Sequence, residues 1–139
     1  MATQYWLVKS EPYKFPFAQL QKDKRTTWDG VRNFEARNNL RAMKKGDLLL
    51  FYHSNEGKEV VGVAKVVAEA YPDPTAKDGD WSVVDIAPHK VLKQPVSLDT
   101  IRGDAELQGF ALLRRSRLSV VPASKAEFER ILALGKTKL

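Results

Sequence analysis

Aromatic and polar residues that suit recognition of a planar ligand fall at the expected ends of strands. They are Trp6, Ser10, Trp28, Asn33, Tyr52, His53, Ser54 and Trp81. Such rings hold a heterocycle by stacking, worth about 1 to 3 kcal/mol per base, while hydroxyl, amide and imidazole groups read its edge. Trp28 is the leading ligand candidate, because the turn-forming pair Asp29-Gly30 follows it and places the indole at a strand end. Trp6 and Trp81 are instead expected mid-strand in the core.

The arginines fall into two groups along the chain. The first comprises Arg32, Arg37 and Arg41, and the second Arg114, Arg115 and Arg117. If the two groups converge, they are placed to grip phosphates beside a pocket; otherwise they support Asp and Glu partners or lie on the surface. The formal net charge of +6 fits either a polyanion-binding protein or a mixed, well-solvated surface.

Motifs for ordinary enzyme chemistry are missing from the sequence. It contains no glycine-rich dinucleotide or P-loop signature, no nucleophile elbow and no zinc-protease motif. Cysteine is absent, which excludes disulfides and thiolate metal sites, and His53 and His89 are too few for a dedicated zinc centre. We expect no catalytic residues, no metal and no cofactor.

The acidic residues fit structural roles better than chemical ones. Glu11, Asp29 and Asp47 each stand next to a turn, where carboxylates commonly accept local hydrogen bonds. The loop over 71–80 lacks the ligand spacing of a calcium loop, so its aspartates are expected to be solvated. His53 has no nucleophile at a recognisable spacing, which favours a hydrogen-bonding or structural role.

The chain of 139 residues fits one domain, 1–139, with a single core. No run of eighteen apolar residues occurs, which predicts a protein that does not cross a membrane and lies in the cytoplasm, or in the nucleus if the source is eukaryotic.

Hydrophobic periodicity predicts the elements that must position these residues. Strands are expected over 4–9, 25–28, 48–53, 59–69, 81–91 and 117–121, with Gly62 marking a bulge. Helical segments are expected over 15–22, 97–101 and 105–114, with longer helices from the Asn33 cap to Met43 and from the Ser124 capping box to Gly135. This pattern predicts an α+β fold, a curled or barrel-like mixed sheet of five or six strands with short peripheral helices.

Several ordered blocks of the sequence resemble the EVE domain family. These are YWLVKSEP, WDGVRNFEARNNLRAMKKGD, FYHSN, VVGVAKVVAEAYPDPT and RLSVVP, which together span most of the chain. The resemblance implies a PUA-like fold related to the YTH domains that read methylated adenine. It also implies a pocket for a flipped, modified base such as 5-methylcytosine or 5-hydroxymethylcytosine. By that resemblance the pocket is lined by Ser10, Trp28, Val31, Asn33, Tyr52, His53, Ser54, Leu118 and Ser119.

Three hypotheses follow. The first is a non-catalytic reader of a modified base in DNA or RNA, whose backbone contacts come from Lys9, Arg32, Arg37, Arg41, Arg114 and Arg115. The second is a protein or enzyme that binds a free nucleoside or similar heterocycle in the same pocket, with Glu11 or His53 in a chemical role. The third is an interaction module with a filled pocket. Only the first predicts steep salt dependence of binding, because neutralised phosphates release counterions.

Overall fold

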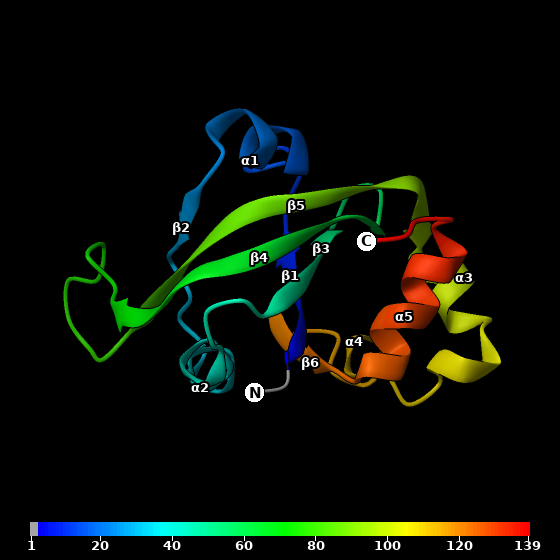
Figure 1. The fold of residues 1–139 in the computed structure, drawn as a ribbon. Coiled ribbons are helices and arrows are strands. Elements are labelled where there is room, and N and C mark those ends of the chain that lie inside the picture. The colour runs from blue at the N-terminus through cyan, green and yellow to red at the C-terminus, as the bar shows by residue number, and fades with distance from the viewer. Residues whose placement is uncertain (1–2) are drawn as a thin grey trace.

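The fold is a six-stranded mixed sheet that curls and carries helices at its periphery (Figure 1). The computed structural model describes residues 3–139. Its strands are β1 (Tyr5–Ser10), β2 (Thr26–Trp28), β3 (Leu48–His53), β4 (Glu59–Pro72), β5 (Ser82–Ser97) and β6 (Val120–Ala123). They lie in the order β2-β5-β4-β3-β1-β6, in which only β1 and β3 are parallel. The expected α+β fold is confirmed, and the sheet stays open, ending at β2 and β6.

The helices are short and surround the sheet. They are α1 (Phe17–Asp23), α2 (Phe34–Ala42), α3 (Leu98–Arg102), the 3-10 turn η1 (Ala105–Leu107), α4 (Ala111–Arg114) and α5 (Lys125–Leu134). Figure 1 shows α3, α4 and α5 gathered at one side of the sheet, away from α1 and β2. No helix in residues 3–139 is long and apolar enough to cross a bilayer.

Local sequence signals start the two longest helices. The side chain of Asn33 accepts a hydrogen bond from the Ala36 amide at 2.9 Å, as its cap position predicts. Ser124 and Glu127 form a capping box in which each side chain accepts from the other's amide, at 3.0 and 2.9 Å. Each such cap stabilises its helix by about 1 kcal/mol. Because the capping contacts span only three residues, these helix starts follow from neighbouring residues alone.

The last strand lies further along the chain than the expected range 117–121. Residues 115–118 form a turn, closed by the Leu118 amide donating to the Arg115 carbonyl at 3.0 Å, and β6 begins only at Val120. Strands β4 and β5 are longer than expected, because β4 continues past 69 to Pro72, which pairs with Ser82, and β5 continues past 91 to Ser97, which pairs with Glu59. The expected irregularity at Gly62 is confirmed, since the pairing register of β4 shifts between Val60 and Gly62.

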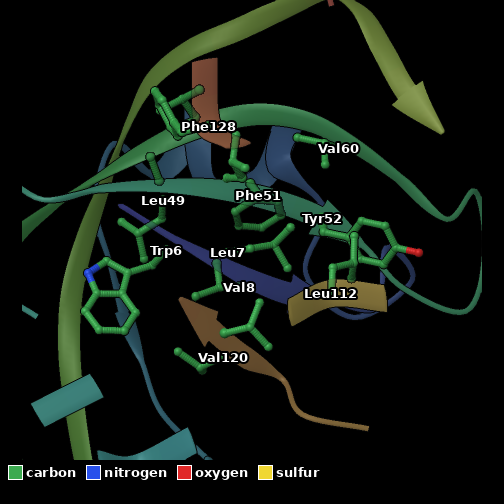
Figure 2. Packing of buried hydrophobic residues seen from close by; sticks show 14 of the residues in the cluster. Trp6, Leu7, Val8, Leu49, Phe51, Tyr52, Val60, Leu112, Val120 and Phe128 are labelled. Carbon is green, nitrogen blue, oxygen red and sulfur yellow. The ribbon is translucent and has the colours of Figure 1, made fainter. Parts of the chain in front are cut away.

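The core lies between the curled sheet and its helices, with β1 and β3 at its centre (Figure 2). The side chains of Leu7, Leu49 and Phe51 are fully buried. Trp6 is a core residue, as expected, and its indole N–H donates to Asp47 at 3.0 Å. Asp47 also accepts from the Lys44 amide at 2.9 Å, which confirms its role as a turn residue.

Candidate ligand-binding site

A hollow of about 350 Å³ opens between the end of β1, strand β2 and the turn before α1. It is lined by Ser10, Lys14, Phe15, Thr26, Thr27, Trp28 and Asp29. In the sheet, β1 and β2 are separated by three other strands, so only the curl of the sheet brings Ser10 and Trp28 to one hollow. Both residues were predicted from the sequence to bind a ligand.

The indole of Trp28 is held by two other aromatic rings. Its ring lies edge-on to Phe51 at 5.7 Å and 80°, and edge-on to Phe15 at 6.2 Å and 78°. Edge-to-face contacts of this kind stabilise a fixed ring orientation by about 0.5 to 1.5 kcal/mol each. Trp28 itself is half-buried, so its indole is both anchored to the core and open to the hollow.

Ser10 offers the hollow an acceptor. Its hydroxyl donates to the Phe15 carbonyl at 2.6 Å, which uses the only proton that the side chain has. The remaining lone pairs of the oxygen can accept from a ligand N–H group. The same bond fixes the turn that carries Phe15, so Ser10 also shapes the wall opposite β2.

Two of the other predicted ligand residues at this end of the sheet, Tyr52 and Ser54, lie on its opposite face. Strands β1 and β3 are parallel and in register, with Ser10 beside His53 and Lys9 beside Tyr52. Because side chains alternate along a strand, Lys9 and Tyr52 point away from the face that holds Ser10. With Ser54 they line a second hollow of about 240 Å³, and Figure 2 shows Tyr52 beside Leu112 of α4. The structure therefore places Ser10 and Trp28 at one hollow and Tyr52 and Ser54 at another.

His53 has a structural hydrogen bond. Its Nε2 accepts from the Phe17 amide at 3.1 Å at the start of α1, so that nitrogen carries no proton. Desolvation lowers the pKa of His53, and the nearby charge of Glu59 opposes this only in part. Glu11, the other candidate for a chemical role, accepts from Asn55 at 2.8 Å and from the hydroxyl of Tyr13.

Four further predicted ligand residues support the fold and line neither hollow. Val31 and Leu118 are buried, and Asn33 caps α2. The Ser119 carbonyl accepts from the Lys9 amide at 3.0 Å, which joins the last strand segment to β1.

The arginines of the first group bind groups within the protein. Arg32 pairs with Asp73 at 2.9 Å, and Arg41 pairs with Asp80 at 2.7 Å. Arg37 donates to the Asp80 carbonyl at 3.2 Å. All three therefore hold the loop over 73–81 against α2, the supporting role that the sequence left open.

The second group reaches the same helix through one member. Arg115 donates to Glu35 in the first turn of α2 at 2.7 Å. Arg114 is exposed to solvent. Basic residues from both groups thus gather near the start of α2.

Asp73 is buried, contrary to the expectation of a solvated loop. Its carboxylate accepts from the Gly30 amide at 3.0 Å and from the amide and hydroxyl of Thr75 at 2.7 and 2.6 Å, besides Arg32. Burial opposes ionisation, but the bonds from Thr75, Arg32 and Gly30 hold the pKa of Asp73 well below its usual range. The sequence does carry a signal for this contact. The side chain of an aspartate often accepts a hydrogen bond from the backbone amide two residues later, which here is the amide of Thr75.

Trp81 is not in the core, contrary to expectation. It directly precedes β5, is half-buried, and stacks on Phe34 at 5.2 Å and 19°. The alternating pattern after Trp81 suggested a strand through this residue, but the chain pairs with β4 only from Ser82. Phe34 was not among the residues predicted from the sequence to bind a ligand.

The sequence and the fold match a known family. The EVE domain model matches residues 4–134. The chain belongs to the EVE domain family. Thymocyte nuclear protein 1 of Mus musculus is 38% identical, with 96% of this chain and 74% of that protein covered. The resemblance expected from the sequence is thereby confirmed.

Solved structures of EVE domain relatives superpose along almost the whole chain. Protein Atu2648 from Agrobacterium tumefaciens is 42% identical with a TM-score of 0.94, covering 97% of this chain and 94% of that one. Human THYN1 protein, in a crystal structure with DNA containing 5-methylcytosine, is 34% identical with a TM-score of 0.88, covering 99% and 100%.

A larger hollow of this EVE domain contains none of the residues predicted to bind a ligand. It measures about 920 Å³ and lies between α5 and the strands, with Tyr5, Phe128 and Lys93 in its lining. Tyr5 shares the face of β1 that carries Lys9, so this hollow opens away from Trp28.

Proposed function

We propose that this EVE domain binds DNA that carries a modified cytosine, such as 5-methylcytosine, and holds the flipped base in the hollow beside Trp28. The supporting relative is human THYN1, whose crystallised chain matches this one along its full extent and was solved in complex with DNA containing 5-methylcytosine. The observation that carries the proposal here is the pairing of Trp28 and Ser10 in one hollow.

The hollow suits a single base in size and chemistry. Ligand pockets measure about 300 to 1,000 Å³, and this one, at about 350 Å³, is at the small end. The exocyclic amino group of cytosine is a donor, and Ser10 offers an acceptor after giving its proton to Phe15. The indole of Trp28 supplies the ring on which a base taken out of the duplex can stack.

Cations near the hollow suit a phosphate backbone. Lys14 lines the hollow itself and is largely exposed, and its ion pair with Glu11 at 3.4 Å is a loose one. Lys9, by contrast, lies on the other face of β1, where its amine donates to the Ser116 carbonyl at 2.9 Å and desolvation lowers its pKa, so it does not serve this hollow. Log affinity falls as log salt concentration rises, and each neutralised phosphate makes that fall steeper by nearly one.

Titration of matched duplexes, with and without one 5-methylcytosine, tests this proposal. Wild type, Trp28→Ala and Trp28→Phe are compared by fluorescence anisotropy at two salt concentrations. We expect tighter, salt-sensitive binding of the modified duplex, loss of the preference in Trp28→Ala, and a retained preference in Trp28→Phe, which keeps a stacking ring.

Free 5-methylcytidine separates the reader from a small-molecule protein that uses the same hollow. Binding of the nucleoside as tight as that of the duplex, with little response to salt, contradicts the proposal. So does equal binding of both duplexes by the wild type.

A further inference from the structure

A stacked aromatic pair with one exposed ring stands at the start of α2. The ring of Phe34 stacks on Trp81, yet Phe34 remains 66% exposed. A single exposed apolar side chain is ordinary on a protein surface. Phe34 differs because a second ring lies beneath it and arginines flank both.

The arginines add positive charge to the pair. The guanidinium carbon of Arg37 lies 5.0 Å from the centroid of Phe34 and 5.9 Å from that of Trp81, and Arg32 lies 5.6 Å from Trp81. Arg37 donates only to neutral oxygens, those of Asn38 and the Asp80 backbone. Its charge therefore remains available for an anion, whereas that of Arg32 is paired with Asp73.

The loop below the pair is fixed in place. Asp73 and Asp80 anchor it to Arg32 and Arg41. Gly79 adopts a φ of +85°, and a Cβ atom there would meet the Trp81 indole nitrogen at 2.7 Å. The loop thus leaves room for the indole, which holds Phe34 in one orientation. We call Phe34, Trp81, Arg32 and Arg37 the Phe34 platform.

We propose that the Phe34 platform binds an unpaired nucleobase by stacking, with an adjacent phosphate on Arg37. An aromatic ring beside a free guanidinium matches the two parts of a nucleotide, and proteins that bind single strands combine these groups. A short segment connects the platform to the hollow: Asp29 lines the hollow, and the amide of the next residue, Gly30, donates at 3.0 Å to Asp73, the partner of Arg32. A base taken out of a duplex into the hollow leaves its former pairing partner without hydrogen bonds, and that unpaired base is the ligand for Phe34. This inference rests on the proposed function, because it assumes that the protein binds the same DNA.

Affinity for labelled single-stranded oligonucleotides, with and without 5-methylcytosine, tests the platform. The variants are Phe34→Leu, which keeps the apolar volume without a stacking ring, Phe34→Tyr, which keeps the ring, and Arg37→Gln. Val91→Ala is the control, since Val91 is an exposed apolar residue further along β5. We expect Phe34→Leu to bind about 5- to 100-fold more weakly to both oligonucleotides, and Phe34→Tyr and Val91→Ala to bind like the wild type. Arg37→Gln should reduce the salt slope by about one.

The outcomes separate this inference from the proposed function. Equal weakening of modified and unmodified DNA, with the preference for 5-methylcytosine retained, supports the platform. If Phe34→Leu and Arg37→Gln both bind like the wild type, the platform is overturned while the Trp28 hollow stands. Weakening by Phe34→Leu in a protein without any preference supports the platform and contradicts the proposed function. If the wild type binds neither single-stranded oligonucleotide, the platform is overturned, and the duplex titrations decide the proposed function separately.

Discussion

Ser10 and Trp28 line the same hollow although their strands are not neighbours in the sheet. The strands β3, β4 and β5 separate them, and the curl of these strands closes the distance. Phe51 of β3 lies beneath the hollow, with its ring 5.7 Å from Trp28. The geometry of the site therefore depends on the packing of the sheet as well as on the two residues themselves.

The close approach of Phe17 to Gly62 should make Gly62→Ala destabilising. A Cβ atom at Gly62 would lie 2.5 Å from the Phe17 ring, which also packs against Phe51 at 5.1 Å. Because the ring cannot move freely, we expect a loss of about 1 to 3 kcal/mol in the free energy of unfolding. Urea denaturation measures it. Gly109→Ala is the matched control, since a Cβ atom there meets nothing within 4 Å; equal stability of both variants would contradict the packing described.

The buried carboxylate of Asp73 should stabilise the protein in a pH-dependent manner. Its pKa is lowered in the folded state, so its contribution is present above the ordinary pKa of about 4 and is lost as the pH falls through the folded value. We expect Asp73→Asn to lower the free energy of unfolding by about 1.5 to 3 kcal/mol at neutral pH.

Chemical denaturation at several pH values measures this effect. The difference between wild type and Asp73→Asn should shrink below about pH 4. Asp78→Asn, an exposed change in the same loop, should have little effect. A constant difference at every pH would show that the charge of Asp73 is not the cause.

His53 should make stability fall in mildly acidic solution. Its folded pKa is lowered, so the unfolded chain binds the proton more readily and stability decreases as the pH falls below about 6.5. Protonation of Nε2 also removes the acceptor for the Phe17 amide. Urea midpoints at about pH 7.5 and about pH 5.5 should differ more for wild type than for His53→Gln, which does not titrate. An equal change in both proteins would contradict this role.

Removal of the carboxylate at Glu35 should strengthen DNA binding. Glu35 pairs with Arg115 beside the Phe34 platform, and both side chains are about half exposed, so the pair contributes at most about 1 kcal/mol to stability. Glu35→Gln frees Arg115 for a phosphate. We expect higher affinity for modified and unmodified DNA alike and a salt slope steeper by up to about one.

Glu129→Gln is the control for Glu35→Gln. It removes the same charge from an exposed position on α5, away from the Trp28 hollow. Anisotropy titrations at two salt concentrations compare the variants. Weaker DNA binding by Glu35→Gln, or an equal gain in Glu129→Gln, would argue against phosphates near α2.

The sequence by itself determined the elements, most of their boundaries and the family. Caps such as Asn33 and Ser124 act through hydrogen bonds within three residues, so they are visible in the order of residues. The buried stripe of α2 follows from helical spacing, and Leu40 and Met43 are fully buried as expected. The apolar residues over 59–69 and their alternation over 81–91 likewise predicted the two strands observed as β4 and β5.

Tertiary structure alone decided which candidate residues share a site. Ser10 and Lys9 are neighbours in sequence, but alternation along β1 sends their side chains to opposite faces, and the partner strand sets what each face meets. Arg32, just before α2, and Arg41, within it, could have faced solvent. Instead, the loop that carries Asp73 and Asp80 folds back and pairs with them. Trp81 precedes β5 and stacks on Phe34 outside the core. These contacts join residues some 40 positions apart, and no local pattern encodes such distant pairings.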